Sequence, residues 1–354
     1  MIARKRNIFA VITLLFVAPL VAEYLLGDLP LRMLTALIVL APAYGGAAIL
    51  IREIARRTGR GWPTMLTLGA AYALIGEGLI TQSLFNPDYM KKHLHLLDPA
   101  YIPALGIGGW WTAFMFNVHT FWSMGVSIAL VEALFPADAE TPWLGWVGDS
   151  VVALVFVLGS AASFGIGFKQ NQFIASHAQL LGAAALSVLL MVSAFLIPAR
   201  RPQRFGVGAP SPWITAAIAF VLGMAVLKAT PIASVLSVGI LHTSSNWGWP
   251  ALGAMLIFDA FFLLLIAFFS RQGGWNALHT LSLAGGGALA YGIRAFTAKP
   301  LVGGVLGMRI SNTVCLTAAV WLIWFAARRI IRYQSLSGAI VEDHAGGELA
   351  SSAP

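Results

Sequence analysis

Long apolar runs, separated by short polar segments, recur from one end of the chain to the other. A helix rises 1.5 Å per residue, so about 20 apolar residues can cross a hydrocarbon core of about 30 Å. This pattern predicts an all-α fold, a polytopic transmembrane helix bundle of ten spans. The spans are expected at residues 8–26, 32–51, 62–84, 109–134, 149–168, 178–198, 212–236, 250–270, 276–293 and 310–327.

Composition supports the same class of protein. The chain of 354 residues is 58% hydrophobic and 10% charged, whereas soluble domains are about half apolar and about a quarter charged. The net charge of +8 does not indicate a nucleic-acid partner, because the basic residues fall at the ends of predicted helices. The expected partner is the lipid bilayer. The only cysteine, Cys315, excludes a disulfide within the chain.

The basic residues also predict the orientation. Most of the 22 Lys and Arg residues fall in segments that are cytoplasmic if ten helices start from an inside N-terminus, as the positive-inside rule requires. Both termini are therefore expected in the cytoplasm, although the loop around Asp138 and Glu140 is acidic. We expect a single transmembrane domain over 1–332. The polar, aperiodic segment 333–354 is expected to be a disordered cytoplasmic tail.

Two short sequences recur and suggest an inverted repeat. Gly-Trp-Pro occurs at 61–63 and 248–250, and His-Thr occurs at 119–120 and 279–280. Each pair would lie on helices that run in opposite directions, as in many secondary transporters. The alternative is coincidence, because glycine, tryptophan and proline are common at membrane interfaces. The two halves would cover residues 1–170 and 171–332.

Ionisable residues inside the apolar spans are candidates for a functional site, since a charge there costs at least about 2.5–3.5 kcal/mol. Glu77 lies about 15 residues into its span and His119 about ten residues into the next. At 1.5 Å per residue, both fall in the outer half of the membrane. Asp259 lies at a similar depth. These groups can relay protons, act as acid and base, or bind a cation; the alternative is that they are structural.

The partner of Glu77 is not decided by the sequence. Arg52, Arg294 and Lys228 are the basic residues that we consider for it. Without one of them, burial favours the neutral carboxyl. Glu23 and Glu132 lie nearer the span ends and are expected to extend toward water.

Uncharged polar residues extend the candidate site. Asn117 precedes His119 in its span and belongs to the candidate buried site. Gln82 belongs to a group of polar residues at the predicted outer face. We interpret this group as the mouth of a polar cavity that opens outward; the alternative is ordinary loop solvation. Pro42 with the glycines at 45–46 and Pro231 predict broken or closely packed helices.

No metal or cofactor site is expected from the spacing of the ligand residues. His93 and His95 lie on one side of an extended loop segment, and imidazole suits zinc or copper. A His-x-His pair alone is a weak signal, so metal binding there is only a minor alternative. The sequence assigns no cofactor.

The first 150 residues or so carry a resemblance. Its residues are Tyr44-Gly45-Gly46, Ile51-Arg52-Glu53, Gly61-Trp62-Pro63, Gly76-Glu77-Gly78-Leu79, Gln82 to Pro87, His119, Trp122-Ser123 and Glu132. This set is similar to an uncharacterised family of bacterial polytopic membrane proteins. The resemblance implies a multi-pass protein of the bacterial inner membrane and assigns no activity.

A fainter resemblance is to the CAAX-processing and bacteriocin-processing intramembrane proteases. These have a Glu-Glu-x-x-x-Arg helix and a Phe-x-x-x-His helix, to which Glu77 and His119 would correspond. Thr81 stands in place of the arginine and Met115 in place of the phenylalanine. These departures argue against proteolysis.

Three functions remain as hypotheses. The first is a permease for a solute or lipid, with an outward-opening polar cavity. The second is a membrane-embedded hydrolase that uses Glu77 and His119. The third is a non-catalytic subunit or receptor, whose partner is open. The chain lacks the phosphate-binding loop of ATPases, so a permease would be coupled to an ion or would use a separate ATPase subunit.

Overall fold

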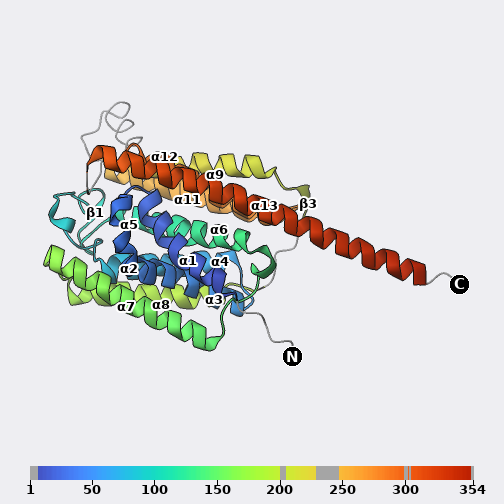
Figure 1. Ribbon diagram of the computed structural model, residues 1–354. Helices are drawn as coiled ribbons and strands as arrows, with labels where there is room; N and C mark the ends of the chain where they lie inside the picture. The colour runs from blue at the N-terminus through green and yellow to red at the C-terminus, as the bar shows by residue number, and fades with distance from the viewer. Residues whose placement is uncertain (1–6, 200–204, 229–246, 299–301, 303, 352–354) are drawn as a thin grey trace.

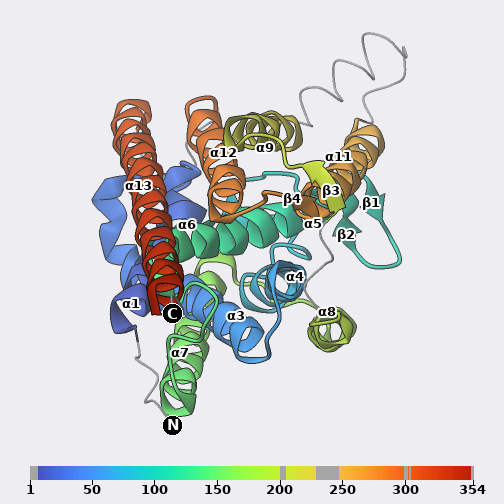
Figure 2. The ribbon, with the colours of Figure 1, turned by 90° about the vertical axis from the view of Figure 1, so that its right-hand side faces the viewer.

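The computed structural model describes residues 7–199, 205–228, 247–298, 302 and 304–351. Figures 1 and 2 show a bundle whose helices run between the same two ends. The α-helices are α1 (Ile8–Pro19), α2 (Leu37–Leu40), α3 (Gly46–Arg57), α4 (Trp62–Leu74), α5 (Gly109–Asn117), α6 (Ser127–Leu134), α7 (Trp146–Asn171), α8 (His177–Leu196), α9 (Pro212–Leu227), α11 (Gly248–Phe269), α12 (Ala277–Ala295) and α13 (Val305–Ser351).

Several spans are not regular α-helix along their whole length. Four contain a π-helical segment: η1 (Leu20–Leu25), η3 (Ala41–Gly45), η4 (Ile75–Ile80) and η6 (Val118–Val126). The short 3₁₀ segments are η2 (Leu31–Ala36), η5 (Tyr89–Lys91) and η7 (Pro136–Asp138). The first span is thus α1 with η1, and the fourth is α5, η6 and α6 in succession.

Eight helical stretches of the described residues are long and apolar enough to cross a membrane. They are Ile8–Leu25, Leu31–Arg57, Trp62–Ile80, Gly109–Leu134, Trp146–Asn171, His177–Leu196, Gly248–Phe269 and Val305–Leu336. The multi-pass helical class is therefore confirmed. The other two expected spans contain helices α9 and α12, but α9 ends at Leu227 and residues 229–236 lie outside the described residues.

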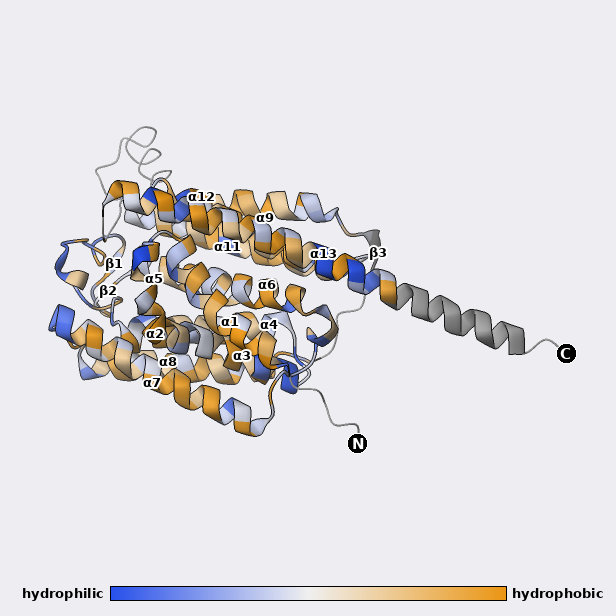
Figure 3. Cartoon of the chain, viewed as in Figure 1, coloured by the Kyte–Doolittle hydropathy of each residue, from blue (hydrophilic) through white to orange (hydrophobic). Residues whose placement is uncertain are grey.

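Burial separates a central span from peripheral ones. In Gly109–Leu134, 83% of the most apolar window is buried, whereas in α7 and α11 the share is 6%. Figure 3 shows apolar residues along the outer helices and hydrophilic residues toward the ends of the bundle. Exposed Leu181, Ile257 and Trp321 belong to this apolar exterior. Lipid is the solvent that such a surface fits.

The two ends of the bundle differ. At one end the long loop after η4 carries the antiparallel pair β1 (Tyr101–Ile102) and β2 (Ile107–Gly108); we name it the hairpin end. The opposite end holds the start of α1, the turn from α3 to α4, and the loop from α6 to α7 (Figure 1). There β3 (Phe205–Gly208) pairs in parallel with β4 (Gln272–Gly273).

Glycine permits two close helix contacts in the first half of the chain. A Cβ added at Gly45 would lie 2.1 Å from the backbone oxygen of Leu15 on α1. A Cβ added at Gly159 on α7 would lie 2.3 Å from Cβ of Pro42. The predicted packing role of the Pro42 and Gly45 region thus matches the geometry, while Pro231 lies outside the described residues.

Two predictions concern parts of the backbone. The disordered tail expected from residue 333 stays a prediction; α13 is assigned through Ser351 and extends beyond the other helices (Figure 1). The inverted repeat stays a prediction: the two Gly-Trp-Pro sequences both lie at helix starts, but His279 contacts the Pro210 carbonyl and Asn276.

Candidate functional site

Four polar residues, one from each of the first four spans, lie on the four π-helical segments. Glu23 is on η1, Tyr44 on η3, Glu77 on η4 and His119 on η6. A π turn holds one residue more than an α turn and occurs frequently at functional sites. The sequence gives partial reasons for these turns, because Pro42 lies within η3 and glycines flank Glu77.

The carboxylate of Glu77 is the centre of a buried hydrogen-bonded group. Its Oε1 lies 2.9 Å from Nε2 of His119. Its Oε2 accepts from the hydroxyl of Ser83 and, at 2.9 Å, from that of Thr81. Glu77 is 7% exposed and His119 is 4% exposed. The structure therefore brings together the two residues at the centre of the sequence hypothesis.

Aromatic rings connect this pair to a second carboxylate. The Tyr44 ring stacks on His119 with centroids 5.8 Å apart, and Tyr72 meets His119 edge-on at 5.7 Å. The hydroxyl of Tyr44 donates to Glu23 Oε1 at 2.6 Å. We name Glu23, Tyr44, Glu77 and His119 the Glu77 network. Its Glu23 end is only half-buried, in contrast to the enclosed Glu77–His119 pair.

No lysine or arginine of the described residues forms an ion pair with the Glu77 network. Arg52 bonds to other carboxylates, and Lys228 donates to Thr297 at 2.5 Å. Arg294 acts on Asp28, in the turn after η1: burial raises the pKa of Asp28 to about 6, and Arg294 opposes this rise. Among the described residues, the network therefore contains two carboxyls, one phenol and one imidazole, without a paired lysine or arginine.

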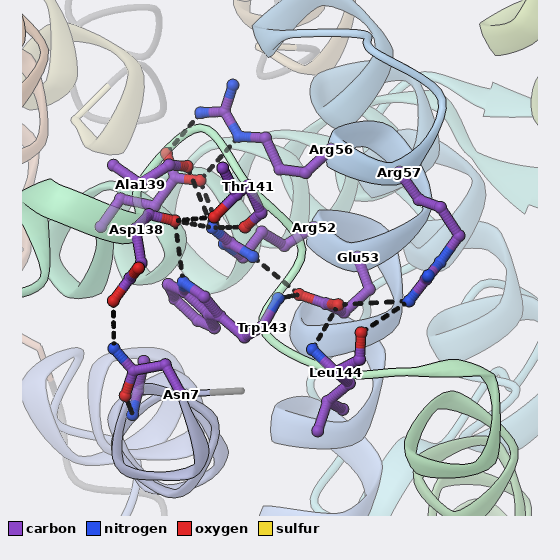
Figure 4. Close-up of polar contacts among 12 residues, drawn as sticks. Asn7, Arg52, Glu53, Arg56, Arg57, Asp138, Ala139, Thr141, Trp143 and Leu144 are labelled. Carbon is purple, nitrogen blue, oxygen red and sulfur yellow. Dashed lines mark hydrogen bonds and ion pairs between the residues drawn. The ribbon is translucent and has the colours of Figure 1, made fainter. Parts of the chain in front are cut away.

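A second buried polar group lies toward the opposite end (Figure 4). Arg52 is 0% exposed, and it bonds to Glu53 at 2.7 Å and to Glu132 at 3.1 Å. Its guanidinium also donates to three carbonyls of the loop after α6 and lies 3.3 Å over the Trp143 ring. Arg56 forms a bidentate pair with Glu132. Glu132 is thus buried between two arginines, and our expectation that it extends to water was wrong.

The carboxylate of Glu53 completes this group, which we name the Arg52 cluster. It accepts the backbone N–H groups of Trp143 and Leu144 at 2.9 and 3.0 Å. Arg57 pairs with Asp149 on α7 at 2.5 Å. Three arginines and three acidic residues thereby fix the loop between α6 and α7 against α3, which is a structural role.

Asn117 and Asp259 form a third polar site, separate from the Glu77 network. The Asn117 side-chain amide donates to Asp259 Oδ2 at 2.8 Å, joining the end of α5 to α11. Both residues line an otherwise largely apolar cavity of about 410 Å³. It extends from this pair to Trp62 and Ser270 and so lies toward the opposite end. The outward-opening polar cavity at the predicted outer face stays a prediction.

The remaining predicted residues lie at the hairpin end. Gln82 accepts the backbone N–H of Ala175 at 2.7 Å and so supports the chain between α7 and α8. His93 lies 3.2 Å from Asp88, and His95 lies 3.0 Å from Asp98. The two histidines thus have separate partners, and the described residues contain no group of three or more His, Cys, Asp or Glu that fits a metal ion.

A second cavity, of about 310 Å³, lies at the hairpin end. Its lining includes His95, Asp98, Trp110, Trp247 and Gly248. Trp110 and Asn117 lie on the same helix, α5, and Gly248 and Asp259 lie on α11. The two cavities therefore follow one another along α5 and α11. Neither is lined by Glu77 or His119.

Comparison with protein-family models identifies the family of this chain. Residues 12–338 match the model of a family described as an uncharacterized membrane protein family. The chain belongs to this family. The predicted resemblance is thereby confirmed as a polytopic membrane family, and it extends well beyond the first 150 residues. Searches of curated proteins and of solved structures returned no match.

Proposed function

We propose that this protein is a permease for a small amphipathic solute and that the Glu77 network binds the coupling proton. The observation that carries the proposal is that two cavities lie one after the other along α5 and α11. Between their levels lie Phe114 and Met255, which are 6% and 0% exposed and belong to one buried apolar cluster. A closed layer between two cavities is what alternating access requires.

The fourth span supplies the link between proton and solute. Asn117 ends α5 and faces the apolar cavity, while His119, two residues later, contacts Glu77. Phe121 and Gly125, also on η6, line the cavity. A change of proton number at His119 would therefore act on the segment that forms the cavity wall. The half-buried Glu23 gives the network its more accessible end.

The orientation and the location are part of the proposal. The last turn of α3 and the turn to α4, at the opposite end, contain Arg56, Arg57 and Arg60, and by the positive-inside rule this end would face the cytoplasm. The hairpin end would then face outward. We place the protein in the bacterial inner membrane on this basis and on the resemblance noted above.

The hydrolase hypothesis has one supporting contact, the hydrogen bond between Glu77 and His119. A hydrolase would also need its scissile bond beside these residues, and neither cavity reaches them. The receptor hypothesis explains neither the two cavities nor the Glu77 network. The permease accounts for both features.

The test is the accessibility of the closed layer. In a Cys315→Ser background, Phe114→Cys and Met255→Cys are labelled in oriented vesicles with a membrane-impermeant thiol reagent from each side. We expect labelling from both sides, with a balance that shifts between pH 5 and pH 8. Glu77→Gln should remove the pH dependence and keep the labelling.

Val131→Cys is the matched control, because Val131 is on the same span, is 0% exposed and lines neither cavity. It should stay unlabelled. If positions 114 and 255 are labelled from neither side, the permease hypothesis is wrong. Labelling from the hairpin side alone would favour the receptor, and labelling from both sides without a pH shift would remove the proton-coupling role of Glu77.

A further inference from the structure

The apolar cavity contains a polar position whose bonding capacity is incompletely used. Its walls come from α4, the α5–η6–α6 span, α9, α11 and α12, and include Trp62, Phe121, Phe258 and Phe262. Its volume of about 410 Å³ falls in the range of small-molecule sites, which are mostly apolar with few polar groups. The polar residues Asn117 and Asp259 lie together on this lining.

Asn117 has one atom without a partner. Its amide nitrogen donates to Asp259 Oδ2 and to the Ala113 carbonyl at 3.0 Å. The side chain is 4% exposed, and its Oδ1 is buried without a hydrogen-bond partner among the described residues. A buried acceptor without a partner costs about 1–3 kcal/mol. A ligand group that donates hydrogen bonds would remove this cost.

Asp259 adds a carboxyl group at the same place. Among the described residues, no basic residue lines the cavity and none forms an ion pair with Asp259. Its Oδ2 accepts from Asn117, and a bound cation would favour the ionised carboxylate. The position therefore offers an acidic group and a carbonyl acceptor, and its complement is a positively charged donor.

We propose that this cavity binds an amphipathic organic amine. The ammonium group lies at Asn117 Oδ1 and the Asp259 carboxylate, and the apolar body lies among the aromatic residues. Aromatic faces also attract cations, by about 0.5–2 kcal/mol. The assignment rests on the proposed permease, because it names the class of solute that the permease moves. A free amine fits better than a phospholipid head group, whose phosphate would find no basic residue in the described lining.

The experiment is equilibrium dialysis of 2-naphthylethylamine against the purified full-length protein in detergent. 2-Naphthylethanol, which has the same apolar body and no positive charge, is the comparison ligand. We expect the amine to bind at least about tenfold more tightly than the alcohol. Equal affinity of the two ligands for the wild-type protein would overturn the proposal.

Three variants locate the site. Asp259→Asn should remove the preference for the amine, while Asp98→Asn, an equivalent change at the hairpin end, should keep it. Leu66→Trp, which fills the cavity and retains Asn117 and Asp259, should abolish binding of both ligands. An unchanged preference in Asp259→Asn, or unchanged binding in Leu66→Trp, would each overturn the assignment. Leu66→Trp keeps the test decisive if Asp259→Asn does not fold.

Two further measurements separate this inference from the permease and from a lipid site. Glu77→Gln should bind the amine as the wild type does. If the protein binds the amine but the closed layer is not labelled, the amine site stands and the permease is overturned. If the closed layer is labelled but the protein does not prefer the amine, the permease stands and the amine site is overturned. Phosphatidylethanolamine added to the micelles should not displace the amine; displacement would assign the cavity to a lipid head group instead.

Discussion

The Arg52 cluster and the Glu77 network are both buried polar groups, and the same spans contribute to both. The span with Tyr44 also contains Arg52, and the span with His119 also contains Glu132. Yet the first group combines guanidinium and carboxylate, while the second combines carboxyl, phenol and imidazole. Arginine keeps its charge at every physiological pH, whereas imidazole changes charge between pH 5 and 8.

This difference distinguishes a group that fixes structure from one that can respond. In the Arg52 cluster the positive and negative charges balance. Arg52 also donates hydrogen bonds to three backbone carbonyls of the loop between α6 and α7. The Glu77 network contains no arginine, so the proposed gain or loss of a proton there would break no arginine pair. We therefore expect substitutions in the first group to affect folding and those in the second to affect function.

The largest effect is expected for Arg52→Met. It leaves Glu53 and Glu132 short of a buried cation, and breaking such a pair costs about 3–5 kcal/mol. Thermal unfolding in detergent and the yield of monodisperse protein measure the loss. Arg332→Met, at an exposed arginine, is the control and should change stability by less than about 0.5 kcal/mol. Wild-type stability in Arg52→Met would break the comparison.

Gly45→Ala should have the next largest effect. The added methyl group would collide with the backbone of Leu15, and such overpacking costs about 1–3 kcal/mol. It would also displace η3 and hence Tyr44. Gly182→Ala on α8 is the matched control, because a Cβ there meets nothing within 4 Å. Equal thermal stability of the two variants would show that α1 and η3 can separate without cost.

Asp28 tests an intermediate case, a half-buried carboxyl that is influenced by one arginine, Arg294. Burial raises its pKa to about 6, above the unfolded value of about 3.9. The folded state therefore binds more protons between these values, and stability should fall as pH rises from about 4 to about 6. Because the side chain is only half-buried, we expect about 1–2 kcal/mol. Asp28→Asn should flatten this part of the stability curve; an unchanged slope would contradict the assignment.

The smallest effect on stability is expected for Glu77→Gln. The amide can still accept from Ser83, Thr81 or His119, so the cost should be about 1 kcal/mol or less, measured by the same thermal unfolding. The loss appears instead in the pH dependence of thiol labelling described above. A destabilisation as large as that of Arg52→Met would show that the Glu77 network, too, is structural.

Sequence patterns predicted the class of fold, because apolar length is a direct consequence of bilayer thickness. Helix α12 (Ala277–Ala295) occupies the span expected at 276–293, although it contains Arg294 and three successive glycines. Many of its residues are buried against other helices, so it needs less apolar surface than a helix that faces lipid.

At the candidate site, depth along the helices correctly suggested that Glu77 and His119 are near one another, but it could not identify their other partners. Tyr44 and Glu23 approach through π-helical turns, which no periodicity in the sequence indicates. Proline in η3 was a partial signal. Asp259 shares a depth with Glu77 but faces Asn117 instead, and a facing direction cannot be read from depth alone.

The four π-helical segments have a consequence for motion. Each holds a residue that an α-helix would not accommodate at that place, and each α-helical residue turns the chain by about 100° and advances it by about 1.5 Å. If such a segment reverted to α-geometry, the part of the span beyond it would rotate and slide by one register step. In the fourth span, that step would swing the Asn117 wall of the cavity relative to Glu132, which the arginines hold in place. A small change of helix geometry in η6 could thus move the cavity wall stepwise, while the Arg52 cluster keeps the other end of the span in place.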